Sequence, residues 1–412
     1  MDACDVIVIG GGPAGSATAT LLAQRGFSVT LYEREHFPRF HIGESLIPYC
    51  FPVLERLGMV DKMKASHFSK KYGVQFVNEH GKLSEPFRFS DYDTHERSQT
   101  WQVLRSEFDH MLLNNAREHG VTVHEGARVL DLLTDGSRVV GVKVKLEGAE
   151  NAEVRAQVVV DASGQSSIIM DRMDLREWDP VLKKAAIWTY WKGAKREPGI
   201  DAGGTVVIQT QGKKGWFWYI PLHDDVVSVG VVAGYDYLFK NRNTKDLETI
   251  YMEEVAQCPG VQPRIVDAVR EGEYLAQKEY SYRAKKAAGD GWVLVGDAFG
   301  FLDPLYSSGV MLALTSASMA SDAISNALDA NDPSEKRLRV WEPTYVKAMD
   351  RMRSLVCAFY DGLNFGRLVR NHPERKNLIT DVLIGNLFND EVDQLWPLIE
   401  EQKQDDLAMA NA

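Results

Sequence analysis

The strongest constraint on the fold is a glycine-rich turn that follows the first apolar segment of the chain. Residues 4–9 (CDVIVI) are apolar, residues 10–15 read GGGPAG, and residues 14–25 have helical composition. A second apolar run, SVTLYE at residues 28–33, ends on Glu33. A strand, a GxGxxG turn, a helix and a second strand form a βαβ unit whose helix N-terminus suits a pyrophosphate. We therefore predict a dinucleotide-binding unit in which Glu33 accepts the ribose hydroxyls.

The rest of the chain predicts further parts around this unit. The helical stretch 105–119 leads to strands that return to the first sheet, and residues 185–235 are rich in aromatic and β-branched residues typical of an antiparallel sheet. A buried strand at 292–298 precedes a helix at about 309–328, and the pattern after Trp341 is mostly helical. The predicted fold class is α/β, with a Rossmann-type cofactor domain, an inserted antiparallel β-sheet substrate domain and a helical C-terminus. The expected domains are a discontinuous cofactor domain of residues 1–65, 100–180 and 285–335, a substrate domain of residues 66–99 and 181–284, and a C-terminal segment of residues 336–412.

Charge and cysteine usage exclude several classes of protein. The net charge of −11 argues against a nucleic-acid partner, because phosphate binding needs a basic face. The four cysteines form no CxxC pair and the histidines show no metal-ligand spacing, so no metal site is expected. His41, His67 and His80 are interpreted as structural or surface residues. The chain starts directly with a strand and has no apolar run of 18 residues, so we expect a cytoplasmic protein without a membrane span.

Three further segments resemble the fingerprints of FAD proteins of the aromatic-hydroxylase type. They are VLVGDAFGFLDPLYSSGV at 293–310, VVVDASG at 158–164, and VLRSEFD, which contains Arg105. The resemblance implies FAD as the cofactor, with Asp297 on the ribityl chain and Arg105 in contact with the flavin. The sequence has no second GxGxxG unit, so the reductant is expected to come from a separate flavin reductase.

Two more motifs narrow the resemblance to flavin-dependent halogenases and their geranylgeranyl-reductase relatives. FHIGESLIP at 40–48 is similar to the segment that both groups lay against the flavin, and GWFWYIP at 215–221 matches WxWxIP, the signature of the flavin-dependent halogenases. Trp216 and Trp218 lie two apart on a strand and so face the same side. The alternatives are a helix cap at the Gly-Glu-Ser segment and two ordinary core tryptophans. The cofactor-binding residues expected from these motifs are Gly10, Gly12, Pro13, Ala14, Gly15, Glu33, Arg39, Glu44, Ser45, Arg105, Asp297, Gly309 and Val310.

The halogenase resemblance also implies catalytic and halide-binding residues. Lys71 in KKYGVQF matches the family lysine, although the adjacent Lys70 leaves the alignment uncertain by one residue. Trp216 and Trp218 would exclude direct oxygen transfer, and the amides of Ser308 and Gly309 would bind halide. In such enzymes FADH2 and O2 give a C4a-hydroperoxide, halide attacks it, and hypohalous acid passes to the lysine. The alternatives are a pair of solvated lysines and a simple helix cap.

The expected substrate is a small aromatic molecule that is already electron-rich. Tyr306 stands where tryptophan halogenases carry a glutamate, which favours a phenol or a pyrrole, free or tethered to a carrier protein. A FAD-dependent dehydrogenase, reductase or monooxygenase of the same fold, acting without halogenation, is the second hypothesis. A non-catalytic flavoprotein or redox-responsive binding module is the third, since it needs neither the tryptophan pair nor Lys71.

Overall fold

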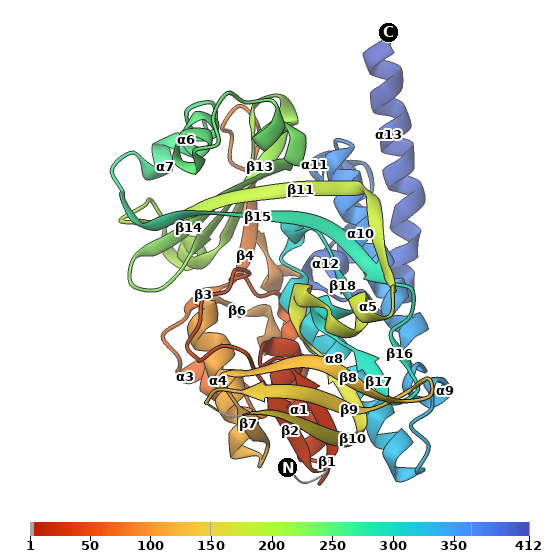
Figure 1. The fold of residues 1–412 in the computed structure, drawn as a ribbon. Coiled ribbons are helices and arrows are strands. Elements are labelled where there is room, and N and C mark those ends of the chain that lie inside the picture. Colours follow the sequence, from red (N-terminus) through yellow and green to blue (C-terminus); the bar gives the residue numbers. More distant parts are fainter. Residues whose placement is uncertain (1–3, 149, 364, 412) are drawn as a thin grey trace.

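The computed structural model describes residues 4–148, 150–363 and 365–411. Two sheets lie one above the other, and helices of the C-terminal segment run along one side of both (Figure 1). No helix within the described residues is long and apolar enough to cross a membrane.

The lower sheet in Figure 1 is built around the first strand of the chain. β1 pairs in parallel with β2 on one side and β10 on the other, and Ile9 is level with both Tyr32 and Asp161. Because both faces are covered there, residues 6–9 of β1 (VIVI) form a continuous buried apolar run. In spatial order the strands are β16 (Ala288–Gly289), β17 (Trp292–Leu294), β10 (Asn151–Asp161), β1 (Cys4–Ile9), β2 (Val29–Tyr32) and β7 (Thr122–His124), with β8 (Ala127–Asp135) and β9 (Arg138–Leu146) continuing from β10 as an antiparallel ribbon.

Small residues let helices pack closely on this sheet. α1 (Pro13–Ala23) contacts both α8 (Gly309–Asp329) and α4 (Arg105–Glu118). The sequences of α1 and α8 are rich in alanine, serine and threonine, and most of these side chains are buried. α1 follows β1 of the lower sheet and α8 follows β18 of the upper sheet, and the first residues of both helices line the same cavity.

The upper sheet is mostly antiparallel, and only β4 and β12 pair in parallel. Its strands in order are β18 (Gly300–Phe301), β15 (Val269–Ala284), β11 (Arg176–Lys192), β14 (Val226–Gly234), β13 (Gly215–Pro221), β12 (Thr205–Gln209), β4 (Gly73–Val77) and β5 (Phe87–Arg88). Along β13 the side chains alternate: Trp216 and Trp218 enter the main core, whereas Phe217 enters a second core beneath α6 and α7. This alternation puts both tryptophans on the face that looks toward the lower sheet.

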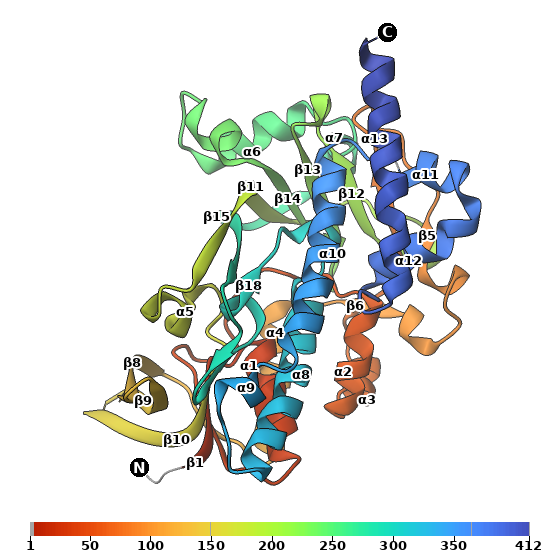
Figure 2. The ribbon, with the colours of Figure 1, turned by 90° about the vertical axis from the view of Figure 1, so that its right-hand side faces the viewer.

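The remaining elements cover the edges. β3 (Ser69–Lys71) and β6 (Thr100–Gln102) form a small separate antiparallel sheet. Figure 2 shows α10 running beside both large sheets, with α13 next to it. The remaining helices are α2 (Phe51–Arg56), α3 (Val60–Ala65), α5 (Ile168–Arg172), α6 (Leu247–Ala256), α7 (Gln262–Ile265), α9 (Glu335–Leu338), α10 (Glu342–Tyr360), α11 (Phe365–Asn371), α12 (Lys376–Ile384) and α13 (Leu395–Asn411).

The predicted fold class is confirmed: a Rossmann-type α/β domain carries an inserted antiparallel sheet and a helical C-terminus. Polar and apolar side chains partly alternate along residues 82–89 (KLSEPFRF), as in a strand, but only Phe87–Arg88 form one and Leu83 makes an isolated bridge. Pro86 lies between these two contacts and lacks the N–H that a continuous ladder needs. The residue bounds of the domains stay a prediction, and the upper sheet extends across them, since β18 pairs with β15.

Candidate active site

Two glycines of the first turn permit close backbone packing, and a third leaves space for a ligand. Gly10 has φ +100°, and a Cβ there would lie 2.5 Å from the carbonyl oxygen of Ala162. A Cβ on Gly15 would lie 1.9 Å from the carbonyl oxygen of Gly10, so these two glycines permit close backbone packing. At Gly12 a Cβ would meet only the Arg39 side chain, at 3.5 Å. Gly12 therefore keeps the space in front of the α1 N-terminus open, as an approaching pyrophosphate requires.

The carboxylate at the end of β2 is tied to this turn. Oε2 of Glu33 accepts a hydrogen bond from the Gly11 amide at 2.7 Å, and Oε1 accepts one from the Glu35 amide at 2.9 Å. Both bonds fix Glu33 beside the open pocket.

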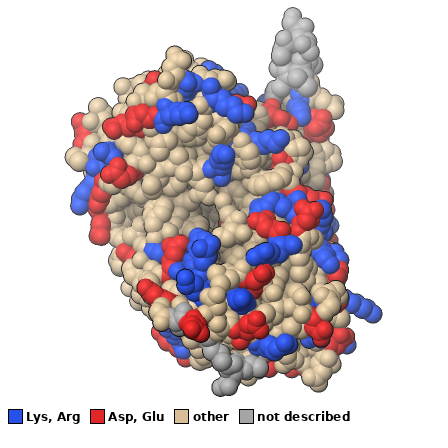
Figure 3. Space-filling view, in the orientation of Figure 1, with Lys and Arg blue, Asp and Glu red and all other residues tan. Residues whose placement is uncertain are grey.

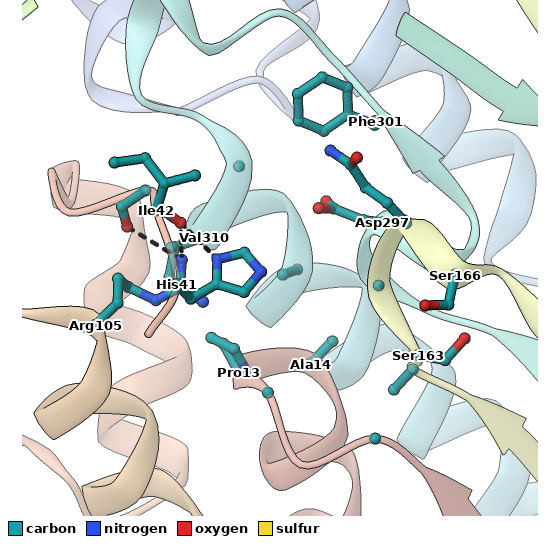
Figure 4. Close-up of a pocket in the computed structure, with 18 of the residues that line it drawn as sticks. Pro13, Ala14, His41, Ile42, Arg105, Ser163, Ser166, Asp297, Phe301 and Val310 are labelled. Carbon is teal, nitrogen blue, oxygen red and sulfur yellow. Dashed lines mark hydrogen bonds between the residues drawn. The ribbon is translucent and has the colours of Figure 1, made fainter. Parts of the chain in front are cut away.

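Two arginines share one buried aspartate. Arg105 donates to both oxygens of Asp109, at 2.7 and 3.0 Å, and Arg39 donates to the same carboxylate at 2.9 Å. Burial alone would raise the pKa of Asp109, but the two guanidinium groups hold it below its ordinary value. Arg105 also donates to the carbonyl of Ile42 at 2.7 Å, which ties the Gly-Glu-Ser segment to α4 (Figure 4).

These groups open into a cavity of about 790 Å³ between the two sheets. Figure 3 shows the molecule hollowed on this face, with basic side chains at the lower edge of the hollow, and Figure 4 shows Pro13 and Ala14 at its floor. The open glycine, the helix N-terminus and the fixed acid fit a dinucleotide such as FAD. The predicted residues that line the cavity are Gly10, Gly12, Pro13, Ala14, Glu33, Arg39, Glu44, Ser45, Arg105, Trp216, Trp218, Asp297, Gly309 and Val310, whereas Gly15, Lys71 and Ser308 lie behind its wall.

We call the part of the site around Gly12, Glu33, Arg39 and Arg105 the cofactor end. The reaction end comprises Glu44, Ser45, Lys71, Trp216, Trp218 and Asp303.

At the reaction end, the polar pair of the Gly-Glu-Ser segment has two separate sets of partners. Oε1 of Glu44 accepts a hydrogen bond from the hydroxyl of Tyr190 at 2.8 Å, whereas Oε2 is buried without a hydrogen-bond partner among the described residues. Burial raises the pKa of Glu44 to about 7. The Ser45 hydroxyl lies 2.9 Å from that of Thr205 on β12, so this segment joins the lower part of the molecule to the upper sheet.

Lys71 is buried directly behind Ser45. Its Nζ donates to Oγ of Ser45 at 2.8 Å and to the carbonyl of Leu46 at 3.0 Å, and only 2% of the residue is exposed. Both acceptors are uncharged, so burial lowers the pKa of Lys71 to about 7. On β3 the neighbouring Lys70 points the other way and is exposed.

The two tryptophans of β13 form one wall of the cavity. Their ring centroids are 6.3 Å apart, and Trp218 donates its indole N–H to the Ser228 hydroxyl at 3.0 Å. The indole N–H of Trp216 is instead bonded to the hydroxyl of Tyr360 at 2.9 Å, which in turn donates to Asp303 at 2.9 Å. Tyr360 lies at the end of α10, so the C-terminal segment supports this wall.

Asp303 begins the loop that leads into α8. Its carboxylate also accepts a hydrogen bond from the Leu305 amide at 3.2 Å, yet burial raises its pKa to about 6. Ser308 is the N-cap residue of α8, and its hydroxyl is buried without a partner among the described residues. Tyr306 packs against Phe359 inside the protein and does not line the cavity. Asp297 lies in the short 3-10 turn Gly296–Ala298, and burial raises its pKa to about 6.

Sequence reasoning did not find several residues that the fold adds to this site. Tyr190 on Glu44, Thr205 on Ser45, and the Tyr360–Asp303 pair on Trp216 all come from segments far apart along the chain. Tyr190, Thr205 and Tyr360 carry no local motif, so only long-range contacts could have indicated them, whereas Asp303 lies within the 293–310 motif but was given no role.

Comparisons by sequence find halogenases, and a comparison by structure finds a flavoprotein/dehydrogenase. A family model described as tryptophan halogenase matches residues 5–103 and 79–364. The tryptophan 2-halogenase of Chondromyces crocatus is 35% identical over 359 residues, covering 86% of this chain and 67% of the relative. The 1H-pyrrole-2-carbonyl-(peptidyl-carrier protein) brominase of Pseudoalteromonas luteoviolacea (strain 2ta16) is 36% identical over 332 residues, covering 80% of this chain and 79% of the relative. The solved structure of a flavoprotein/dehydrogenase from Cytophaga hutchinsonii superposes with a TM-score of 0.87 at 30% identity, covering 99% of this chain and 100% of that chain.

Proposed function

The chain belongs to the tryptophan halogenase family of flavin-dependent enzymes, and from this premise we propose that it halogenates an electron-rich aromatic substrate with reduced FAD, O2 and halide. The observation that carries the proposal is Lys71: a buried lysine with no charged partner among its hydrogen bonds, joined through Ser45 to the wall of the cavity. A lysine on the protein surface would have no such connection to the cavity.

FAD would be held at the cofactor end. Gly12 and the N-terminus of α1 would receive the pyrophosphate, Glu33 the ribose, and Arg39 and Arg105 would add positive charge along the wall. When bound and reduced, the flavin supplies the activation of O2 through which halide is oxidised to hypohalous acid.

Lys71 would receive the hypohalous acid and hold it against the substrate. With a pKa near 7, a large fraction of this side chain is the neutral amine, which can act as a nucleophile toward electrophilic halogen. Ser45 orients the amine by accepting its hydrogen bond at 2.8 Å. A free hypohalous acid would diffuse and react without selectivity, so retention by the protein is what gives the product its regiochemistry.

Trp216 and Trp218 would fill the space beside the flavin and exclude water from it. The Ser308–Gly309 turn is the proposed halide site, since Gly309 reaches the cavity and the α8 N-terminus favours an anion.

A phenol or a pyrrole is the proposed substrate class. The support is that one relative is a brominase of a carrier-bound pyrrole. The family resemblance also implies a missing glutamate at Tyr306, but Tyr306 packs inside the protein and does not line the cavity. We propose a carrier-tethered pyrrole as the first substrate to test, with reduced flavin delivered by a separate reductase.

A flavin dehydrogenase or reductase is the second candidate, favoured by the structural likeness to a flavoprotein/dehydrogenase. The two differ in their need for halide. We would incubate the protein with a flavin reductase, NADH, O2 and bromide, together with free phenols, indoles and pyrroles and a pyrrolyl carrier protein. Products with a bromine isotope doublet that vanish when bromide is omitted support halogenation, whereas bromide-independent oxidation supports the dehydrogenase.

A further inference from the structure

Three potential metal ligands meet outside the cavity, from segments that are remote in sequence. His67 lies between α3 and β3, Glu107 lies in the first turn of α4, and His223 lies in the turn between β13 and β14. Nε2 of His67 is 2.9 Å from Oε2 of Glu107, and Nε2 of His223 is 3.4 Å from Oε1 of the same carboxylate. The three ligand atoms all lie within 4.8 Å of one another. We call these residues the His–Glu–His cluster.

The spacing of these atoms suits a small tetrahedral ion. With metal–nitrogen and metal–oxygen bonds of about 2.0–2.1 Å, two ligand atoms of a tetrahedral zinc site lie about 3.3 Å apart. Nε2 of His223 is 3.4 Å from Oε1 of Glu107, close to that value, and Nε2 of His67 is 2.9 Å from Oε2 of the same carboxylate. Small rotations of the more exposed Glu107 and His67 side chains would bring both nitrogens and one oxygen onto a single ion. Two imidazoles and one carboxylate are also a ligand set that zinc uses when a fourth position stays open. Oδ2 of Asp224 is 3.8 Å from Nε2 of His223, so a further carboxylate lies next to the cluster.

Exposure in the cluster is graded in a way that suits ion binding. The side chain of His223 is only 11% exposed, whereas those of Glu107 and His67 are 37% and 66% exposed. One ligand is thus fixed in the protein and the others reach solvent, which leaves an entry path. The two imidazole rings meet edge to face, with centroids 4.4 Å apart, so both present a nitrogen to the same carboxylate.

We propose that the His–Glu–His cluster binds one divalent transition-metal ion of the zinc type, with water or Asp224 as the fourth ligand. The ion would replace the hydrogen bond between His67 and Glu107 and the close contact between His223 and Glu107, and it would connect three segments next to the cavity. His67 lies four residues before Lys71, Glu107 two residues after Arg105, and His223 two residues after Pro221 of the tryptophan strand. Its role would be structural, holding the small β3–β6 sheet, α4 and the β13–β14 turn together. The inference stands on these side chains alone and is independent of the halogenase proposal.

The test uses tag-free full-length protein, treated with EDTA and dialysed. Zinc binding is measured by calorimetry, and cobalt substitution is followed by the visible absorption of a tetrahedral site. We expect one zinc per chain with a dissociation constant of micromolar order or tighter, and a thermal midpoint that rises with zinc. His67→Ala, at the exposed edge of the cluster, should weaken binding at least tenfold and abolish the rise without unfolding the protein. Glu107→Gln should do the same.

The matched control is His80→Ala, because His80 is an exposed histidine outside the cluster. It should bind zinc as the parent does. Two outcomes would overturn the proposal. One is that no zinc binds at a protein concentration 100-fold above the expected dissociation constant. The other is zinc binding that survives both His67→Ala and Glu107→Gln; in either case the cluster would be only a contact between two histidines and a glutamate.

Discussion

Buried ionisable side chains have charged partners at one end of the active site and uncharged partners at the other. At the cofactor end, Asp109 is buried but is held between Arg39 and Arg105, so its pKa lies below its ordinary value. At the reaction end, Lys71 and Glu44 are equally buried but have only uncharged hydrogen-bond partners, and burial moves the pKa of each to about 7.

This difference agrees with the role proposed for each end. An end that binds a dinucleotide needs fixed charges and amides, because its ligand carries phosphate at every pH of interest. An end that handles a reactive halogen needs groups that can lose or gain a proton near neutrality, and burial without a counter-ion is how a protein obtains them. Substitutions are therefore expected to have their largest effect at the cofactor end and smaller effects at the reaction end.

The largest effect is expected at Gly12. Its φ of −69° suits any residue, and its only close neighbour is the Arg39 side chain, so Gly12→Trp should fold. The indole would occupy the pyrophosphate space, and FAD occupancy, read from flavin absorbance after gel filtration, should fall to near zero. Gly234→Trp is the control, since Gly234 has open space around it and lies outside the cavity. Full flavin occupancy in the Gly12 variant would refute the cofactor end.

Lys71→Ala should impair the reaction end and leave the cofactor end intact. FAD binding, oxygen consumption and peroxide release should stay near the parent values, because none of these needs the amine. Halogenated product should fall by about two orders of magnitude or more, the scale typical of a lost catalytic group. Lys70→Ala changes an exposed side chain on the same strand and should leave product formation unchanged. Equal product from both variants would remove Lys71 from the mechanism.

A smaller effect is expected where the C-terminal segment supports the tryptophan wall. Tyr360→Phe removes the hydroxyl that joins the indole N–H of Trp216 to Asp303. Leaving such buried groups unpaired typically costs about 1–3 kcal/mol, which urea unfolding would detect. Because the wall loosens, we also expect more peroxide per product. An unchanged free energy of unfolding together with unchanged coupling would show that the hydroxyl does not position Trp216.

The pH dependence of product formation should be modest but of definite sign. If the neutral amine of Lys71 accepts the halogen, the rate should rise by about an order of magnitude from pH 6 to pH 8 and then level off. Glu44 ionises in the same range, so Glu44→Gln is measured in parallel and should keep the rise. A rate that falls with pH would mean that the ammonium form is the active one.

How far the sequence predicted this molecule depended on how local each feature is. The GGGPAG turn and Glu33 lie within one βαβ unit, so spacing alone predicted that Gly12 and Glu33 lie together, whereas Arg105 was predicted from the family resemblance. The alternation on β13 likewise predicted that Trp216 and Trp218 share a face, and both line the cavity.

The reaction end was less accessible, because its environment is built from long-range contacts. A lysine pair in a sequence says little about which side chain is buried, and the pKa of Lys71 depends on Ser45, Leu46 and the surrounding apolar residues. Tyr360 reaches Trp216 across 144 residues of chain, which no periodicity reports.

The most direct test of the contrast between the two ends is the pKa of Lys71 itself. The protein would be labelled with ¹³C at the lysine Cε, and the Lys71 signal assigned by its absence in Lys71→Arg. Its shift would then be followed from pH 5 to pH 11. A midpoint near 7 is predicted, with unfolding stability that rises between pH 7 and the ordinary lysine pKa, because there the unfolded chain binds a proton that the folded protein does not. A midpoint near the ordinary value of 10.5 would contradict the account, because the reaction end would then carry a permanent charge as the cofactor end does.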